Sequence, residues 1–562
     1  MDVRKRALIG LCAVMMLVGL AVSAEAFYID DKNTLSFSAK GQTRVTFRLQ
    51  DADGYTYPDT KVGDLVQWRN LALLEVDHDL KDLTKSLGIL WPLKELKIRS
   101  KYHLVGRFMY DALYNVGSDA FKTVRDEDRE NIDSYKQAYD LWEAYIDFSR
   151  GPAFLRIGRQ ILAWGETDIF RLLDGINPLD DSFGGPFEDL DDRRIPLWML
   201  RASYNVGSVG PIASFTVEGF WVPGTWDTRV GPWAPKGTPY ALPLPVKAIY
   251  DIALVCPPER KMSHSRWGVR LQGMLGSKAN ISVAHYRSFL DRPKSKVILT
   301  EPVEGPLLDT SLAKIELNWE PVQVTGASIN YWESMTDIVF RGEVAWFWDE
   351  PIWRHGINDR PLHPTSFIPL SSNVLSLLAL AVPPDLRSNG LYGLPVDPQS
   401  GEIPNEDILR YMIGFDKQVW IRPLNKVSMF FLSMQYFGQW IPDYPDKNPP
   451  VTDVQIPDKF APEVNSITGE PIPDYTQFPT VKETEHIFTA LINTMYMKGT
   501  LIPQLAGAYD TRGAWLILPS VQYIREPFRF GLQYAAVLGN FVGPGLFRDR
   551  DQISFSFTYL LN

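Results

Sequence analysis

The stretch QISFSFTYLL, residues 552–561, decides the fold that the sequence predicts. Its apolar positions are Ile553, Phe555, Phe557, Tyr559 and Leu561, and its polar positions are Gln552, Ser554, Ser556 and Thr558. Alternation with a period of two is typical of a β-strand that has one apolar face and one polar face. Such a strand fits either the core of a soluble β-sandwich or the wall of a membrane β-barrel.

The first 26 residues have the three parts of a secretory signal peptide. Arg4, Lys5 and Arg6 form a basic start, residues 7–22 form an apolar run, and small residues at positions 23–26 suit a signal peptidase. We therefore expect residues 1–26 to be removed and residues 27–562 to form one barrel domain, with a membrane anchor as the alternative. Only Cys256 would remain after cleavage, which excludes an internal disulfide.

The composition restricts how this chain could cross a membrane. After the signal, no uncharged apolar stretch reaches the length that a membrane helix needs, so a closed β-structure is the remaining route. The 17 Trp, 24 Tyr and 29 Phe fit the aromatic girdles of a barrel, and they also fit a saccharide-binding β-protein. The net charge of −10, with charges scattered along the chain, favours no nucleic-acid partner.

The alternating pattern of residues 552–561 returns along the whole chain. A hairpin turning at Gly151-Pro152 and segments near residues 266–275, 315–319, 338–348 and 528–538 all read as strands. Their polar faces carry charges of both signs, as a watery lumen would. The charged residues predicted to line this lumen wall are Glu143, Asp147, Arg156, Arg270, Glu316, Arg341, Glu343 and Arg529.

Long irregular stretches separate the predicted strands. Residues 222–262, 350–408 and 441–480 are rich in proline, and the charged residues 113–138 read as a surface loop. Barrels of the outer membrane tolerate such loops on the extracellular side. The residues that remain suggest roughly 14–18 strands, at about 20 residues for each strand and its turn. The predicted fold is therefore an all-β, antiparallel transmembrane barrel with long extracellular loops.

The densest charged region, residues 164–194, is predicted to fold into the lumen and narrow it. The residues assigned to this constriction are Arg159, Glu166, Asp168, Arg171, Asp174, Asp191, Arg193 and Arg194. The alternative is a purely structural network of ion pairs, and the spacing matches no calcium-loop signature, so no metal or cofactor is expected. Arg159 falls on the apolar side of its strand, which places it near lipid headgroups or indicates a shift of register.

Two further features leave function open. The apolar stretch 374–382 lies between proline-rich loops and suits either a landing site for an apolar ligand or a packed loop element. The seven histidines show no metal-binding spacing, and no G-x-S-x-G motif occurs. No catalytic residue is assigned, although a hydrolase could assemble its site from several strands.

Four short motifs carry a resemblance to a known family. They are Gly158-Arg159-Gln160, Trp164-Gly165-Glu166, Asn177-Pro178-Leu179-Asp180 and Arg194-Ile195-Pro196. With them the chain resembles the Gram-negative envelope proteins catalogued as domain of unknown function 1302. The resemblance implies an outer-membrane β-barrel associated with envelope partners and with export or uptake of hydrophobic compounds, and it brings no catalytic residues. Barrels usually end on an aromatic residue, whereas this chain ends Leu561-Asn562.

The sequence therefore predicts an outer-membrane channel or transport component for small hydrophobic compounds in a Gram-negative bacterium. Its expected partners are outer-membrane lipid, the barrel insertion machinery and periplasmic or inner-membrane transport proteins. A soluble secreted or periplasmic saccharide-binding protein and an outer-membrane hydrolase are the two alternatives.

Overall fold

The computed structural model describes only part of the chain. The described residues are 27–28, 30, 33–52, 58–80, 97–232, 234–241, 253–291, 293–299, 313–351, 405–444, 459–464, 471–474, 482–540 and 542–561. The predicted signal peptide and the apolar stretch 374–382 lie outside these residues.

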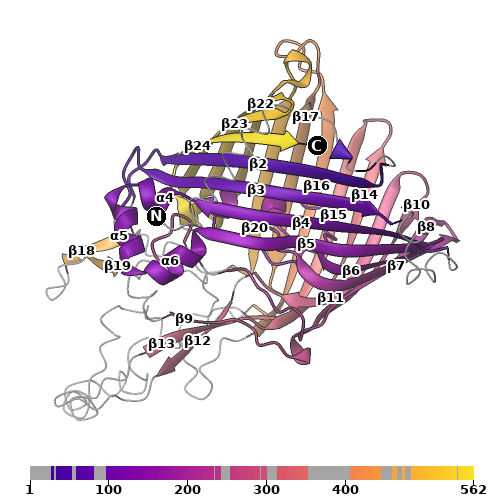
Figure 1. Cartoon of the computed structure of the whole chain (residues 1–562), viewed down its shortest axis with the longest axis horizontal. Coiled ribbons are helices and arrows are strands. Elements are labelled where there is room, and N and C mark those ends of the chain that lie inside the picture. Colours follow the sequence, from indigo (N-terminus) through magenta and orange to yellow (C-terminus); the bar gives the residue numbers. More distant parts are fainter. Residues whose placement is uncertain are drawn as a thin grey trace.

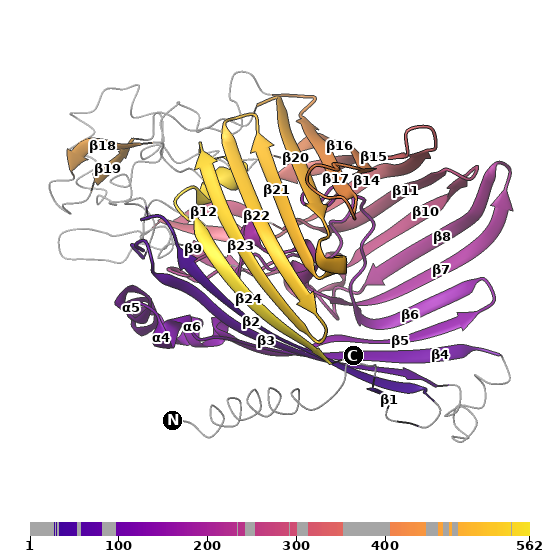
Figure 2. The same cartoon turned by 90° about the horizontal axis from the view of Figure 1, so that it is seen from above.

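Eighteen strands form the wall of one closed barrel (Figures 1 and 2). They are β2 (Leu35–Arg48), β3 (Leu65–Asp79), β4 (Arg99–Asp111), β5 (Gln137–Arg150), β6 (Ala153–Gln160), β7 (Leu197–Val209), β8 (Ile212–Val222), β10 (Arg266–Leu275), β11 (Ala279–Phe289), β14 (Pro321–Glu333), β15 (Ile338–Pro351), β16 (Asn405–Val419), β17 (Phe430–Trp440), β20 (Thr484–Thr494), β21 (Leu501–Asp510), β22 (Ala514–Arg525), β23 (Phe528–Gly539) and β24 (Gln552–Leu561). Each pairs antiparallel with its neighbours in the wall. The short β1 (Phe27–Tyr28) adds a nineteenth strand against β2.

Pairing between β2 and β24 closes the barrel. The register runs from Ala39 opposite Leu561 to Arg48 opposite Gln552, and β2 also pairs with β3. Closure leaves no unpaired edge along these two strands, which is what a strand needs in lipid. The predicted fold is confirmed, and the observed eighteen strands lie at the upper limit of the predicted range.

The two faces of the wall differ in the way that the terminal strand predicted. In β24, Phe555 is 49% exposed on the outside, whereas Ser554 and Thr558 are buried on the inside. In β11, Val283 is 55% exposed and its neighbour Ala284 is 1% exposed. Large apolar side chains are exposed in this way around the wall, so the outer surface is a lipid-facing belt. This belt removes the basis of the soluble saccharide-binding alternative, whose apolar faces would pack against each other.

Trp332 is exposed near one end of the outer surface, and the other seven exposed tryptophans of the wall strands gather near the opposite end. They lie within the first or last four residues of seven strands: Trp68, Trp198, Trp221, Trp267, Trp348, Trp440 and Trp515. Trp221 and Trp267 are directly opposite each other across β8 and β10. Tryptophan prefers the membrane–water interface because its ring is apolar and its N–H is polar. These residues therefore form one aromatic girdle of the barrel.

The two ends of the barrel carry different connections. One end has the connection 80–98 and seven shorter ones, 151–152, 210–211, 276–278, 334–337, 420–429, 495–500 and 526–527. The opposite end, which carries the tryptophan girdle, has the long connections 112–136, 161–196, 223–265, 290–320, 352–404 and 441–483. In bacterial barrels the short turns face the periplasm and the long loops face outward. We call these the short-turn end and the long-loop end.

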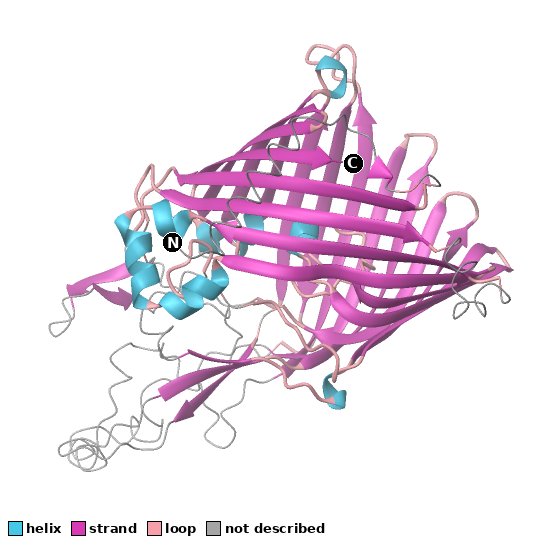
Figure 3. Cartoon of the chain, viewed as in Figure 1, coloured by secondary structure: helices cyan, strands magenta, loops and turns pink. Residues whose placement is uncertain are grey.

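The charged residues 113–138 are helical, where the sequence predicted an irregular surface loop. Helices α4 (Leu113–Val116), α5 (Asp119–Glu127) and α6 (Arg129–Tyr135) stand at the long-loop end (Figure 3). The charges obscured the apolar residues of this segment, which pack against Val66 of the wall. The buried members are Leu113, Tyr114, Phe121, Val124 and Ile132. No helix among the described residues is both long enough and apolar enough to span a membrane.

Two small sheets lie outside the wall. One contains β9 (Ala253–Cys256), β12 (Lys294–Leu299) and β13 (Ala313–Asn318), and the other contains β18 (Lys459–Val464) and β19 (Pro471–Asp474). Both stand at the long-loop end (Figure 1). Glu316 belongs to β13, so its predicted place in the lumen wall is wrong. Its strand alternates as the wall strands do, but it pairs with loop strands.

Candidate functional site

The connection between β6 and β7, residues 161–196, folds into the lumen. Gln160 and Leu197, which flank it, are directly opposite each other in the register of β6 and β7. The chain therefore leaves the wall and returns to the adjacent strand, and everything between is an excursion. We call residues 161–196 the inward segment.

The middle of the inward segment is fixed to the wall by two charged residues of β15. The Glu343 carboxylate accepts hydrogen bonds from the backbone N–H groups of Glu166 and Leu173, each at 2.6 Å. Arg341 donates to Asp168 at 2.8 Å and to Asp416 of β16 at 2.8 Å. Both residues lie in the half of β15 that is nearer the short-turn end, so the segment reaches deep into the barrel.

The apolar side chains of the inward segment pack against the wall strands between β7 and β17. Trp164, Leu173 and Ile176 are each at most 1% exposed and belong to a cluster with residues of β7, β8, β11, β14, β15, β16 and β17. The Trp164 indole donates to Glu218 at 3.0 Å, and Glu218 is also paired with Arg201 and Arg270. Burial of these side chains makes the inward segment part of the lumenal core.

The returning part of the segment contacts the first wall strands. Arg44 of β2 and Arg69 of β3 both pair with the Glu188 carboxylate. Burial raises the pKa of a carboxyl group, but these two guanidinium groups outweigh it and lower the pKa of Glu188 below its usual value. Asp174 is different, because burial raises its pKa in spite of Arg171 and Arg194. The segment therefore bridges β2 and β3 on one side of the lumen and β15 on the other.

Three segments meet inside the barrel at the long-loop end. Phe187 of the inward segment, Tyr240 of the 223–265 connection and Phe547 of η7 (Gly543–Phe547) share one buried cluster. The ring centroids of Phe187 and Phe547 are 5.9 Å apart. Arg48 and Arg550 both donate to the Pro239 carbonyl, at 3.2 and 2.7 Å. These contacts narrow the opening of the lumen at the long-loop end.

The structure brings most of the predicted constriction residues together on the inward segment. Glu166, Asp168, Arg171 and Asp174 line or contact its deep part. Arg193 pairs with Asp181, and Arg194 pairs with both Asp174 and Asp191. These pairs support the structural reading of the charged cluster as well as the constriction. Selection of solutes by these residues stays a prediction.

Arg159 lies near the end of β6, directly opposite Ala144 of β5 and Trp198 of β7. Its guanidinium bonds to Asp140 at 2.7 Å and is nearly buried beside Trp142. The pairing of β4 with β5 shifts between Val105 and Gly106, opposite Trp142. Neither pairing of β6 is shifted at Arg159, so the two explanations that the sequence left open both stay predictions.

The predicted wall residues, apart from Glu316, lie on barrel strands. Asp147 and Arg156 form a two-point ion pair at 2.6 and 2.9 Å between β5 and β6. Glu143 is half-buried on β5, and Arg529 is exposed beside the short turn, where it pairs with Glu526 at 2.8 Å. That these residues line the path of a solute stays a prediction.

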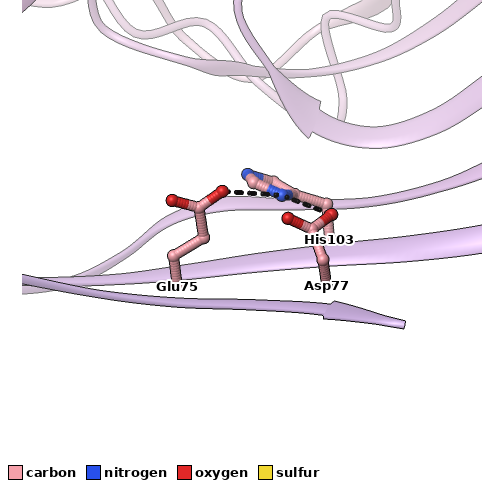
Figure 4. A group of neighbouring side chains, drawn as sticks. All are labelled: Glu75, Asp77 and His103. Carbon is pink, nitrogen blue, oxygen red and sulfur yellow. Dashed lines mark hydrogen bonds and ion pairs between the residues drawn. The ribbon is translucent and has the colours of Figure 1, made fainter. Parts of the chain in front are cut away.

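A second charged cluster on the wall was missed by sequence reasoning. Glu75, Asp77 and His103 offer one donor atom each within 4.8 Å of one another (Figure 4). The His103 Nδ1 is 3.1 Å from Asp77, and Lys101 Nζ reaches the same carboxylate at 2.6 Å. Because Lys101 already neutralises Asp77, an ion-pair network accounts for the cluster. Its sequence signal is weak, because His103 joins the other two only through the register of β3 and β4.

A cavity of about 740 Å³ lies beside the inward segment. One side is formed by the segment, with Phe170 and Leu172, and the other by residues of β20–β23, with Leu516 and Leu518. Most of its lining is apolar or aromatic, and further members are Tyr286, Phe289, Trp319, Val322, Val324, Phe347, Leu491 and Phe547. Its volume is in the range of pockets that hold small molecules.

The sequence matches one family over nearly its whole length. The model of the protein of unknown function DUF1302 matches residues 7–561. The chain belongs to the DUF1302 family. No curated protein matches the sequence of this DUF1302 member.

Three solved structures that are similar to this DUF1302 protein come from Pseudomonas. OccK3 (OpdO) of Pseudomonas aeruginosa has a TM-score of 0.43 and 8% identity, over 94% of this chain and 95% of its own. OccK9 (OpdG) of the same organism has a TM-score of 0.44 and 10% identity, over 96% and 100%. A BenF-like porin from Pseudomonas fluorescens Pf-5 has a TM-score of 0.43 and 8% identity, over 95% and 100%. The assignment of a closed barrel to this chain follows from its own strand register.

Proposed function

We propose that this DUF1302 protein is an outer-membrane channel or transport component for small hydrophobic compounds. The observation that supports the proposal is the mostly apolar cavity inside a closed barrel whose outer surface is a lipid-facing belt. A lumen that only conducted water and ions would have no need of an apolar lining at this depth. The inward segment would narrow the path beside the cavity.

The inward segment can be removed without interrupting the strand pairing of the wall. Gln160 and Leu197 are cross-strand partners. Replacing residues 162–195 by the dipeptide Asn-Gly would leave a four-residue connection, which also contains Ile161 and Pro196, and would join β6 and β7 as a hairpin. We expect this variant to raise the single-channel conductance in planar lipid bilayers severalfold. Equal conductance of the variant and the natural chain would contradict a gating role.

Separate experiments test the location of the protein and the hydrolase alternative. A barrel of this kind sits in the outer membrane fraction and migrates differently on a gel before and after heating. Recovery in the soluble periplasm would overturn the proposal. The hydrolase alternative predicts turnover of ester substrates by the purified protein, whereas we expect none.

A further inference from the structure

A row of uncharged polar side chains crosses seven adjacent wall strands on the lumenal side. The pairs Asn493–Gln504, Gln504–Ser520, Ser520–Gln533 and Gln533–Ser554 are directly opposite in the registers of β20 to β24. The row continues through Ser554–Thr46 and Thr46–Gln67 to β3. Residues directly opposite each other lie on the same face of a sheet, so all seven point inward together. We call this set the amide row.

Two members of the amide row line the cavity. Gln504 and Gln533 are cavity residues, and they stand among the apolar side chains Leu491, Leu516 and Leu518 of the same strands. Thr46, at the other end of the row, bonds to Ser554 at 2.9 Å and to Gln67 at 3.3 Å. Within the described part of the chain, the Gln504 and Gln533 amides have no such side-chain hydrogen bond. Each therefore offers a donor and an acceptor to whatever enters the cavity.

The charged residues around the cavity are paired with one another. Arg171 pairs with Asp291, Arg193 with Asp181, and Arg410 with Glu350. Asp168 and Glu188 are paired with arginines of the wall. Among the charged lining residues that the structure describes, Asp189 alone has no ion pair, and it is acidic. The cavity therefore presents no unpaired cation to a carboxylate.

We infer that the cavity selects uncharged compounds that have an apolar body and one hydroxyl or carbonyl group. This inference rests on the proposed function and names its substrate class. The apolar lining takes up the body, while the Gln504 and Gln533 amides bond to the single polar group. A carboxylate would lose its hydration without gaining a free cation, which is costly in an apolar site. An ammonium group would meet only carboxylates that are already paired, apart from Asp189.

The test is equilibrium dialysis of the detergent-solubilised full chain with three matched probes. These are 4-nitrobenzyl alcohol, 4-nitrobenzoate and 4-nitrotoluene, each corrected for uptake by protein-free micelles. We expect the alcohol to bind roughly tenfold more tightly than either the benzoate or the nitrotoluene, because two hydrogen bonds distinguish it from them. Benzoate binding as tight as that of the alcohol would overturn the inference.

Variants test whether Gln504 and Gln533 of the amide row cause the tighter binding of the alcohol. In the double variant Gln504→Leu/Gln533→Leu we expect the alcohol to bind no better than nitrotoluene. The matched control is Gln522→Leu, since Gln522 also faces the lumen from β22, opposite Gly531, but does not line the cavity. An alcohol preference that survives the double variant would contradict the assignment. The heat-dependent gel shift of each variant checks that the barrel is folded.

The proposed function and the inferred substrate class can be contradicted independently of each other. If the alcohol binds selectively but the natural chain conducts nothing in planar bilayers, the proposed function is wrong and the binding site remains. If the chain conducts and both the alcohol and the benzoate bind equally, the proposed function remains and the inference is wrong.

Discussion

At the scale of single residues, Glu343 supports more of the lumenal architecture than its position on a wall strand suggests. It is 3% exposed, and its two carboxylate oxygens accept the backbone N–H groups of Glu166 and Leu173. Glu343→Ala would leave two N–H groups without an acceptor, at about 1–3 kcal/mol for each that stays buried. We expect the inward segment to loosen and the single-channel conductance to rise.

The control for Glu343 is an acidic residue of the wall that holds no backbone group. Asp416 of β16 faces the same part of the lumen and pairs with Arg341. We expect Asp416→Ala to change conductance much less than Glu343→Ala, because Arg341 keeps its bonds to Asp168. Equal effects of the two variants would show that charge, and not anchoring of the segment, sets the conductance.

Glu188 makes the attachment of the inward segment to β2 and β3 dependent on pH. Its pKa is lower in the folded chain than the usual value of 4.5, because Arg44 and Arg69 outweigh the effect of burial. A lowered pKa contributes stability above pH 4.5, and this contribution is lost as the pH falls through the folded-state value. We expect protease cleavage within residues 177–196 to increase below pH 4.5 in the natural chain.

A variant separates this carboxyl from the other acidic groups. Glu188→Gln removes the charge at every pH, so its cleavage rate at pH 7 should already be raised and should change less on acidification. A natural chain whose cleavage is constant from pH 7 to pH 3 would contradict the role of Glu188.

At the scale of elements, each wall strand has one face toward lipid and the other face toward the lumen. Val283 is near the middle of β11 and is 55% exposed on the outer face. An arginine on the lipid face of a barrel costs about 2–4 kcal/mol at the bilayer midplane. We expect Val283→Arg to lower the free energy of unfolding by this amount, measured by guanidinium titration in phospholipid vesicles.

An exposed valine outside the wall provides the comparison. Val62 is 62% exposed in the connection between β2 and β3. We expect Val62→Arg to change the free energy of unfolding by less than about 0.5 kcal/mol, as surface substitutions usually do. A Val283→Arg variant as stable as Val62→Arg would mean that the outer face does not meet lipid.

Elements were predictable where the local pattern and the long-range pairing agree. The alternation of residues 552–561 identifies β24 and its two faces, because a wall strand between two neighbours needs one polar and one apolar side. The alternation near Ile315 and Leu317 is equally regular, yet β13 pairs with loop strands. Alternation reports the faces of a strand and carries no information about its partners.

The candidate site was predictable only in part for the same reason. The dense charges of residues 164–194 indicated an inward segment, since so many ion-pairing groups need partners. The importance of Gln504 and Gln533 depends on register across β20 to β24 and on the ion pairs made by neighbouring arginines. Neither the strand register nor the ion pairing can be inferred from a local stretch of sequence. Glu75, Asp77 and His103 were missed on the same ground.

At the scale of the whole molecule, the lumen is divided into two unequal parts. The inward segment packs against β7, β8, β11 and β14–β17, and it fills that side with buried apolar side chains and paired charges. The cavity lies between the inward segment and β20–β23, although Tyr286 of β11, Val322 of β14 and Phe347 of β15 also line it. The amide row lies on the side of β20–β23. In the proposed function, the path of a solute therefore passes along β20–β23. Substitutions facing the lumen from β21 and β22 should alter solute binding more than those from β7 and β8.

The seam between β2 and β24 also determines when this protein can take shape. The two strands of this seam are separated by almost the entire chain, from Ala39 to Leu561. The barrel therefore cannot close before both strands are present. Until the second side of the seam has been synthesised and exported, both sides present open edges that would bind any strand they meet. If the protein resides in the outer membrane as proposed, we expect the chain to cross the periplasm unfolded and to need a chaperone there.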